Sequence, residues 1–104
     1  MVSTRFTEDA GVRYPVICGA MYPCSNPELV AAAAEGGGLA IMQPVSLTSV
    51  HGWDLREGIR YMRNLTDKPI GFNALIEKGS KKYLEKMNGW IDIALEEGIR
   101  FFVT

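Results

Sequence analysis

Few side chains in this sequence are of the types that carry out acid–base, nucleophilic or metal chemistry. His51 is the only histidine of the 104-residue chain, and an imidazole can transfer protons near neutral pH. The alternative interpretation is a loop histidine that only hydrogen-bonds to its surroundings. Cys18 and Cys24 lack the Cys-x-x-Cys spacing and, with one histidine, do not supply the four ligands of a usual zinc site. The sequence therefore predicts structural thiols, no metal centre and a single candidate for acid–base work.

The segment around His51 is a comparatively long polar connection, 44–53, that includes Ser46 and ends at Trp53. It follows an apolar run, and residues that follow buried strands are well placed to line a binding site. We expect this loop to shape a pocket for a small-molecule substrate. Trp53 is expected to pack rather than to stack on a ligand.

Composition and charge exclude several partners. Lys and Arg number 11 and Asp and Glu 12, which gives a formal charge of −1, and no basic cluster suits a nucleic acid or an anionic membrane. The longest apolar run, 29–34, is far shorter than the roughly 20 residues of a membrane span. The N-terminal residues show no signal peptide. We expect a cytoplasmic protein.

Apolar runs at 14–21, 39–43, 70–76 and 99–104 do not alternate with polar residues, which is typical of strands buried on both faces of a parallel sheet. Helices are predicted between them. The first begins with Asn26 as N-cap and Pro27 at the first helical position, and it stops at the glycines 36–38.

The second predicted helix follows an N-cap at Asp54. The third is capped by Ser80 and ends at Gly98. Their buried faces are predicted from helical periodicity and consist of Leu55, Ile59, Met62 and Leu65 in the second and Leu84, Met87, Ile91, Ala94 and Leu95 in the third.

The predicted order is βαβαβαβ, with strand starts at 15, 39, 69 and 99. This spacing fits either an open doubly wound sheet or a (β/α)8 barrel. At about 30 residues per unit, eight units need roughly 240 residues, the usual barrel length. We interpret residues 1–104 as an incomplete TIM-barrel domain, the first three βα units and the fourth strand. Self-association through the exposed strand edges is then expected.

Three motifs in order resemble the start of the nitronate monooxygenase family, formerly called 2-nitropropane dioxygenase. They are Tyr-Pro-Val-Ile-Cys-Gly-Ala-Met at 14–21, Ser-Asn-Pro-Glu-Leu-Val at 25–30 and Glu-Gly-Gly-Gly-Leu at 35–39, and Gly-Phe-Asn-Ala-Leu follows at 71–75. The resemblance extends from Arg13 to the end of the chain. It implies the N-terminal half of a (β/α)8 barrel with FMN across the carboxyl ends of its strands.

The resemblance also implies which residues bind the cofactor. Gly19, Ala20 and Met21 would line the flavin, and Asn73 would hydrogen-bond to it, although a polar side chain satisfying local backbone is the alternative for Asn73. The chain departs from the commoner family pattern after the second strand, where Gln43 is a further residue that could reach the flavin.

For a complete enzyme, the resemblance implies oxidation of alkyl nitronates with oxygen. The related FMN-dependent enoyl-acyl-carrier-protein reductases take hydride from a nicotinamide instead, and nothing in these residues separates the two branches. The family's proposed catalytic histidine and phosphate-binding glycines come from later strands, so the 104 residues alone are expected to be inactive. Two alternatives stay open: another flavin barrel of the dihydroorotate or inosine-monophosphate dehydrogenase type, and a non-catalytic flavodoxin-like module.

Overall fold

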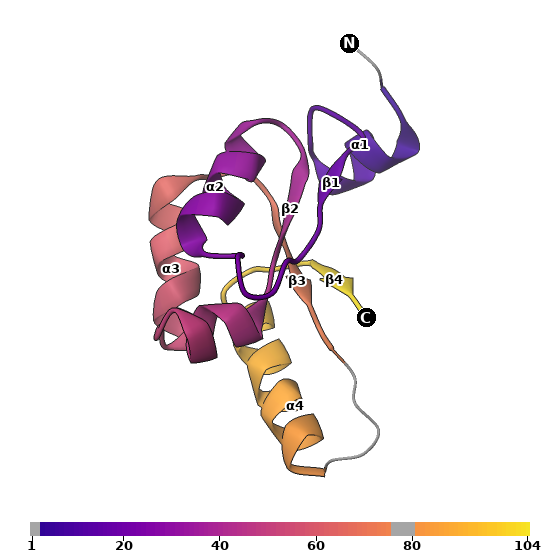
Figure 1. Cartoon of the computed structure of the whole chain (residues 1–104). Coiled ribbons are helices and arrows are strands. Elements are labelled where there is room, and N and C mark those ends of the chain that lie inside the picture. The colour runs from indigo at the N-terminus through magenta and orange to yellow at the C-terminus, as the bar shows by residue number, and fades with distance from the viewer. Residues whose placement is uncertain (1–2, 76–80) are drawn as a thin grey trace.

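Four parallel strands form the centre of the computed structural model, in which residues 3–75 and 81–104 are described. The strands are β1 (Ile17–Cys18), β2 (Leu39–Met42), β3 (Ile70–Asn73) and β4 (Phe101–Val103). They lie side by side in chain order, β1-β2-β3-β4 (Figure 1). The predicted order of strands and helices and the parallel sheet are therefore confirmed.

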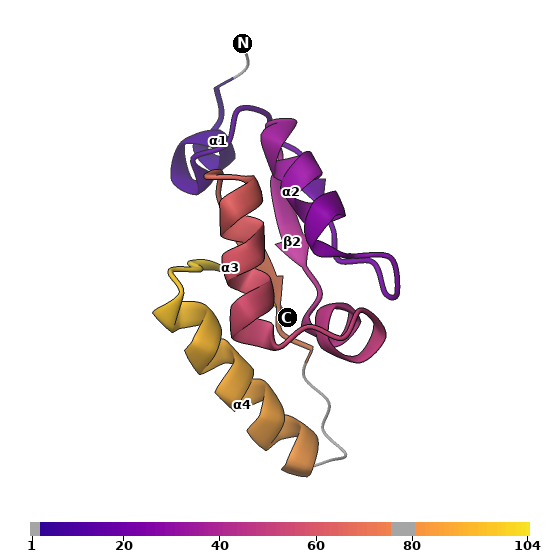
Figure 2. The same ribbon diagram turned by 90° about the vertical axis from the view of Figure 1, so that its left-hand side faces the viewer.

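The helices are α1 (Arg5–Ala10), α2 (Pro27–Glu35), α3 (Leu55–Leu65) and α4 (Lys81–Glu96). Three of them, α2, α3 and α4, connect successive strands and lie together in one layer (Figure 2). A doubly wound sheet reverses its strand order and carries helices on both faces. Here the order runs in one direction with the connecting helices in one layer, so the fold is that of part of a (β/α)8 barrel.

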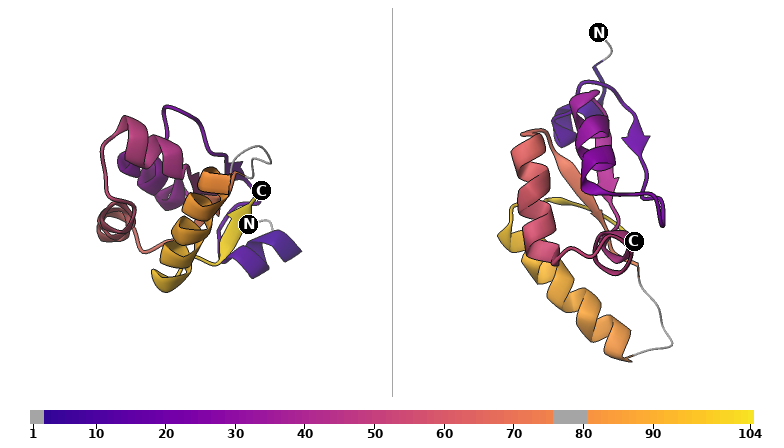
Figure 3. Two further views of the ribbon diagram at one scale, coloured as in Figure 1. Left: turned by 90° about the horizontal axis from the view of Figure 1, so that it is seen from below. Right: turned by 60° about the vertical axis from the view of Figure 1, so that its left-hand side comes forward.

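The two faces of the sheet bury different apolar clusters. On the face toward the connecting helices, Met42, Phe72 and Ala74 pack into the main core. On the opposite face, Leu39 and Ile41 pack with Ala10 of α1, which lies apart from α2 and α3 (Figure 3). The central strands β2 and β3 are therefore covered on both faces, as their continuous apolar runs predicted.

Helix α1 has no counterpart in the elements predicted from the sequence. It is only six residues long, too short for a clear apolar period, and it begins with a capping box in which Thr4 and Thr7 each accept from the other's backbone N–H. Its last turn ends at Gly11 with φ 71°, a left-handed conformation that glycine adopts without steric cost.

The first strand is shorter and more exposed than predicted. The run 14–21 forms only a two-residue strand, and Ile17 is 52% exposed. The physical reason is its position: β1 is an edge strand that pairs with β2 alone among the described residues. The other strands are also shorter than the predicted 39–43, 70–76 and 99–104.

The predicted helices are largely confirmed. Asn26 caps α2 by accepting from Leu29 N at 2.8 Å, and Asp54 caps α3. Two face assignments were wrong: Leu65 is 40% exposed and Leu95 54% exposed. Leu65 is the last residue of α3, and Leu95 is turned by about 100° from its buried neighbour Ala94, which carries its side chain off the buried face. The predicted cap Ser80 lies outside the described residues.

The connection 44–53 is a compact helical turn and not an open loop. Residues Ser46–Val50 form a π-helix, and the Thr48 hydroxyl donates to Pro44 O at 2.8 Å. Leu47 is buried and lies directly beside Gly58 of α3, where an added Cβ would come within 2.7 Å of its side chain. Trp53 stacks on Tyr61 with ring centroids 4.9 Å apart, which confirms its predicted packing role.

An ion-pair network joins α3 to the end of α4. Arg60 Nε lies 2.7 Å from one oxygen of Glu97, and Arg56 pairs with both Glu96 and Glu97. The hydrogen bond from Arg60, helped by Arg56, lowers the pKa of the Glu97 carboxyl. In the described part of the chain, no helix has the length and apolar character needed to cross a bilayer.

Candidate functional site

The carboxyl ends of the four strands lie at one edge of the sheet, called here the carboxyl edge. The register of the sheet pairs Met42 with Phe72 and Asn73 with Val103. Gln43 directly follows Met42, so it comes level with Asn73 on the neighbouring strand. Successive side chains of a strand point to opposite faces, which places both amides on the Ile41 face of the sheet, away from α2 to α4.

The two amides have unused hydrogen-bonding capacity. Gln43 is only 8% exposed, and its Oε1 accepts from Val45 N at 3.0 Å, so its amino group is the part left to donate. Asn73 is half-buried and makes no side-chain hydrogen bond within residues 3–75 and 81–104. The alternative in which Asn73 satisfies nearby backbone therefore has no support in the described contacts. A half-buried amide without a partner is suited to a ligand.

The segment 19–21 follows β1 at the same edge. A Cβ built at Gly19 would meet no heavy atom within 4 Å, so the space in front of this backbone is open. Ala20 packs against the cluster formed by Leu39 and Ile41. Met21 is 44% exposed, and its backbone N–H already donates to the Ser25 hydroxyl at 2.7 Å. A ligand that approaches this segment would meet open space at Gly19, a small apolar surface at Ala20 and an exposed side chain at Met21.

His51 is held by the neighbouring connection. Its Nε2 lies 3.0 Å from Pro23 O, and since a carbonyl oxygen only accepts, Nε2 donates. The contact joins the β2–α3 connection to the β1–α2 connection. This contact is of the kind expected for a loop histidine that hydrogen-bonds to its surroundings.

The two cysteines are the remaining candidates from the sequence. Cys18 is half-buried in β1 and Cys24 is exposed, and both are free thiols. Among the described residues, no cluster of three or more histidine, cysteine or acidic side chains can hold a metal ion.

Two serines at this edge were not singled out from the sequence. Ser25 is 3% exposed and binds Met21 from both sides, since its hydroxyl accepts from Met21 N and its own N–H donates to Met21 O. Ser46 is fully buried, and its hydroxyl has no hydrogen-bond partner within the described ranges. Each serine lies two residues after a proline in a connecting segment, and serine and proline are typical of turns, so the sequence offers no signal that separates these two.

The carboxyl edge thus combines open backbone at Gly19 with two amide side chains that can donate and accept. Such groups can bind and orient a planar heteroaromatic ring that carries carbonyl and imino groups along one side. This arrangement fits binding and not chemistry by the side chains themselves.

Comparison with known proteins shows the family. The nitronate monooxygenase family matches residues 3–104. The chain belongs to this family. It is 34% identical, over 86% of its length, to a probable nitronate monooxygenase of Staphylococcus saprophyticus. It is 32% identical, over 93% of its length, to a (3aS,4S,5R,7aS)-5-hydroxy-7a-methyl-1-oxo-octahydro-1H-indene-4-carboxyl-CoA dehydrogenase of Rhodococcus jostii.

A solved structure agrees with the fold of this nitronate monooxygenase family member. The FabK structure from Thermotoga maritima superposes with a TM-score of 0.74 at 28% identity and covers 98% of this chain, but only 30% of the FabK chain. The chain likewise spans 25% of each of the two curated relatives. The family is one of flavin-dependent oxidoreductases, so the class predicted from the motifs is confirmed.

Proposed function

We propose that this chain supplies the first part of an FMN site in an oxidoreductase that oxidises alkyl nitronates with oxygen. The observation that carries the proposal is the pair of amides at the carboxyl edge. Asn73 has no side-chain partner among the described residues and lies level with Gln43 on the adjacent strand. Family membership over residues 3–104 supports the same assignment.

The residues present fit such a cofactor. Gly19 leaves open the space that a side chain would fill, which lets a planar ring approach the backbone. Asn73 and the amino group of Gln43 can hydrogen-bond to the polar side of a flavin, and Ala20 and Met21 can contact its apolar part. Bound FMN would supply the redox chemistry, taking electrons from the substrate and passing them to oxygen.

The chain's own residues then bind and orient. Gln43 is fixed by its bond to Val45 N, so its free amino group is directed before any ligand arrives, which lowers the entropic cost of binding. The pair formed by Ser25 and Met21 holds the segment after β1 in place. None of these groups removes a proton from substrate, and a nitronate, already deprotonated, needs no base for this step.

A second substrate class is favoured by one relative. The Rhodococcus jostii protein is named for a carboxyl-CoA substrate, so an acyl thioester is the alternative to a nitronate. Oxygen consumption with an alkyl nitronate in the absence of any nicotinamide is the signature of the first function. Turnover that requires both a nicotinamide and an enoyl thioester would instead support the acyl-thioester function.

Titration of the 104-residue chain with FMN, followed by flavin fluorescence, tests the cofactor assignment. We expect saturable quenching and a Kd about tenfold weaker in Asn73→Ala, since hydrogen bonds to the ring are lost. Asn64→Ala is the matched control, because Asn64 is exposed on α3. An unchanged Kd in Asn73→Ala would reject Asn73 as a flavin ligand. Absence of saturable binding would show that the residues of the later strands are indispensable for binding.

A further inference from the structure

A cavity lies at the opposite edge of the sheet, where the strands begin. It has a volume of about 340 Å³ and includes Gly11 after α1, Pro69 and Ile70 at the start of β3, and Arg100 and Phe101 at the start of β4. We call this the amino edge. It is separated from the candidate flavin site by the length of the strands, and the proposed oxidoreductase function gives it no role.

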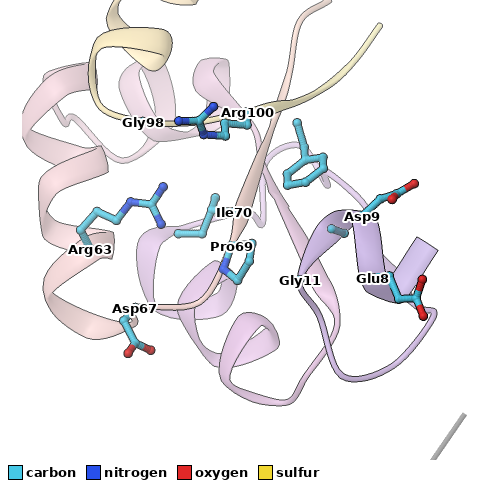
Figure 4. A pocket seen from close by; sticks show the side chains of 11 residues that line it. Glu8, Asp9, Gly11, Arg63, Asp67, Pro69, Ile70, Gly98 and Arg100 are labelled. Carbon is cyan, nitrogen blue, oxygen red and sulfur yellow. The ribbon is translucent and has the colours of Figure 1, made fainter. Parts of the chain in front are cut away.

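Two arginines define the chemistry of this cavity. Arg63 on α3 and Arg100 before β4 both line it, and their guanidinium groups point toward the same space above Ile70 (Figure 4). Arg100 makes no ion pair or hydrogen bond with any residue that the structure describes. Arg63 uses only Nη1, which donates to Lys68 O at 3.2 Å.

The acidic residues of the cavity do not neutralise these two groups. Glu8 and Asp9 of α1 direct their carboxylates away from the arginines (Figure 4), and Glu8 accepts from Ser3 Oγ at 3.1 Å. The Asp67 side chain is 91% exposed and lies near Lys68 Nζ, 3.9 Å away. Solvent screens such exposed carboxylates strongly. No carboxylate among the described residues therefore pairs with the two guanidinium groups in the space that they face.

The apolar residues beneath the two arginines would strengthen the attraction between the guanidinium groups and an anion placed between them. Ile70 is 3% exposed, and Pro69 and Phe101 line the same wall. An apolar surface lowers the local dielectric constant and raises the attraction between opposite charges. Guanidinium groups present planar pairs of N–H donors that match the oxygens of phosphate, and two of them balance a dianion.

We propose that the amino edge binds a phosphate group between Arg63 and Arg100. The group could belong to free inorganic phosphate or to a phosphate monoester, since both present the same three oxygens to the two forks. A bound phosphate would join α3 to the start of β4, in addition to the ion pairs that join α3 to the end of α4.

Isothermal titration of the 104-residue chain with inorganic phosphate, at fixed ionic strength and without flavin, tests the site. We expect saturable binding of one phosphate per chain, with affinity about tenfold lower in Arg63→Gln and in Arg100→Gln, from the loss of charge-assisted hydrogen bonds. Arg5→Gln is the matched control, because it removes one positive charge from an exposed position outside the cavity. Its affinity should equal that of the parent chain.

Two further arms make the outcome decisive. A titration with glycerol 2-phosphate in place of inorganic phosphate distinguishes the two ligands: binding of both identifies a site open to monoesters, and binding of phosphate alone identifies an inorganic-anion site.

Circular dichroism of each variant confirms folding. Arg100→Lys, which keeps the positive charge without the paired N–H donors of a guanidinium, should bind phosphate with intermediate affinity. Unsaturable uptake, or equal losses in Arg5→Gln and Arg100→Gln, would overturn the proposal.

Discussion

The Asn26 side chain decides where α2 begins. Its Oδ1 accepts from Leu29 N at 2.8 Å, satisfying one backbone N–H that the helix cannot pair internally. We expect Asn26→Ala to lower the free energy of unfolding by about 1 kcal/mol, measured by urea denaturation. Asn64→Ala, within α3 and exposed, should not destabilise the chain, since alanine is the better helix former. Equal losses in both variants would remove the capping role.

Gly71 is required by close packing inside β3. A Cβ there would overlap Cδ1 of Ile41 and approach Phe101 O at 3.4 Å, and Ile41 is itself buried. We expect Gly71→Ala to destabilise the fold by about 1–3 kcal/mol. Gly89 in α4 has no atom within 4 Å of the corresponding position, so Gly89→Ala should be neutral or stabilising by up to about 1 kcal/mol. Thermal unfolding of the two variants makes the comparison, and a destabilised Gly89→Ala would contradict it.

At the scale of elements, the sequence predicts those that have a clear period or cap and misses those that depend on context. The apolar runs of β2 and β3 and the caps Asn26 and Asp54 are local signals, and the structure has them. The π-helix 46–50 and α1 are different. Serine, threonine and proline are typical of open loops, and only the packing of Leu47 against Gly58 of α3 shows why the chain coils there.

The candidate site also combines residues that the sequence predicts with contacts that depend on the surrounding structure. The family resemblance points to Asn73, whereas Gln43 is a candidate because it follows the second strand, where the chain departs from the family pattern. Their level positions follow from the register of β2 and β3. That Gln43 is already bound to Val45 N and Met21 to Ser25 could not be predicted, because both bonds depend on the conformation of the chain after each strand.

The ion pairs between α3 and α4 give the chain a pH-dependent element. The pKa of Glu97 is lowered, first by its hydrogen bond from Arg60. A carboxyl whose pKa is lower in the folded state stabilises the fold above its ordinary value, and this contribution is lost as the pH falls through the lowered pKa. We expect Glu97→Gln to be less stable than the parent chain at pH 7, with the difference shrinking below about pH 4.

Chemical denaturation at several pH values measures this difference. Glu85→Gln is the matched control, because Glu85 is exposed on α4, the helix that Glu97 directly follows, and has no described partner. Its effect on stability should be small and should not follow the same pH course. A Glu97→Gln difference that stays constant from pH 7 to pH 3 would show that the ion pairs contribute nothing specific.

At the scale of the whole molecule, both outer strands are open. Among the described residues, β1 and β4 each pair on one side only, and Ile17 and Val103 are 52% and 45% exposed. Unpaired strand edges with apolar side chains pair readily with other chains. We expect the 104-residue chain to self-associate, with a mass by light scattering that rises with concentration.

Val103→Lys should reduce this association, because a charge on an edge strand opposes pairing. Leu95→Lys is the control: Leu95 is 54% exposed but lies on α4, away from the strand edges. A monomer at all concentrations, or the same loss of association in both variants, would show that the edges do not drive it.

The hydrogen bond between His51 and Pro23 has one more property, which follows from its direction. It closes a loop between residues 28 positions apart, and the ring donates through Nε2. A neutral imidazole makes this bond only as the tautomer that carries its proton on Nε2, which leaves Nδ1 as the acceptor of the ring. The connections that follow β1 and β2 are therefore joined through a side-chain bond whose donor and acceptor are both fixed.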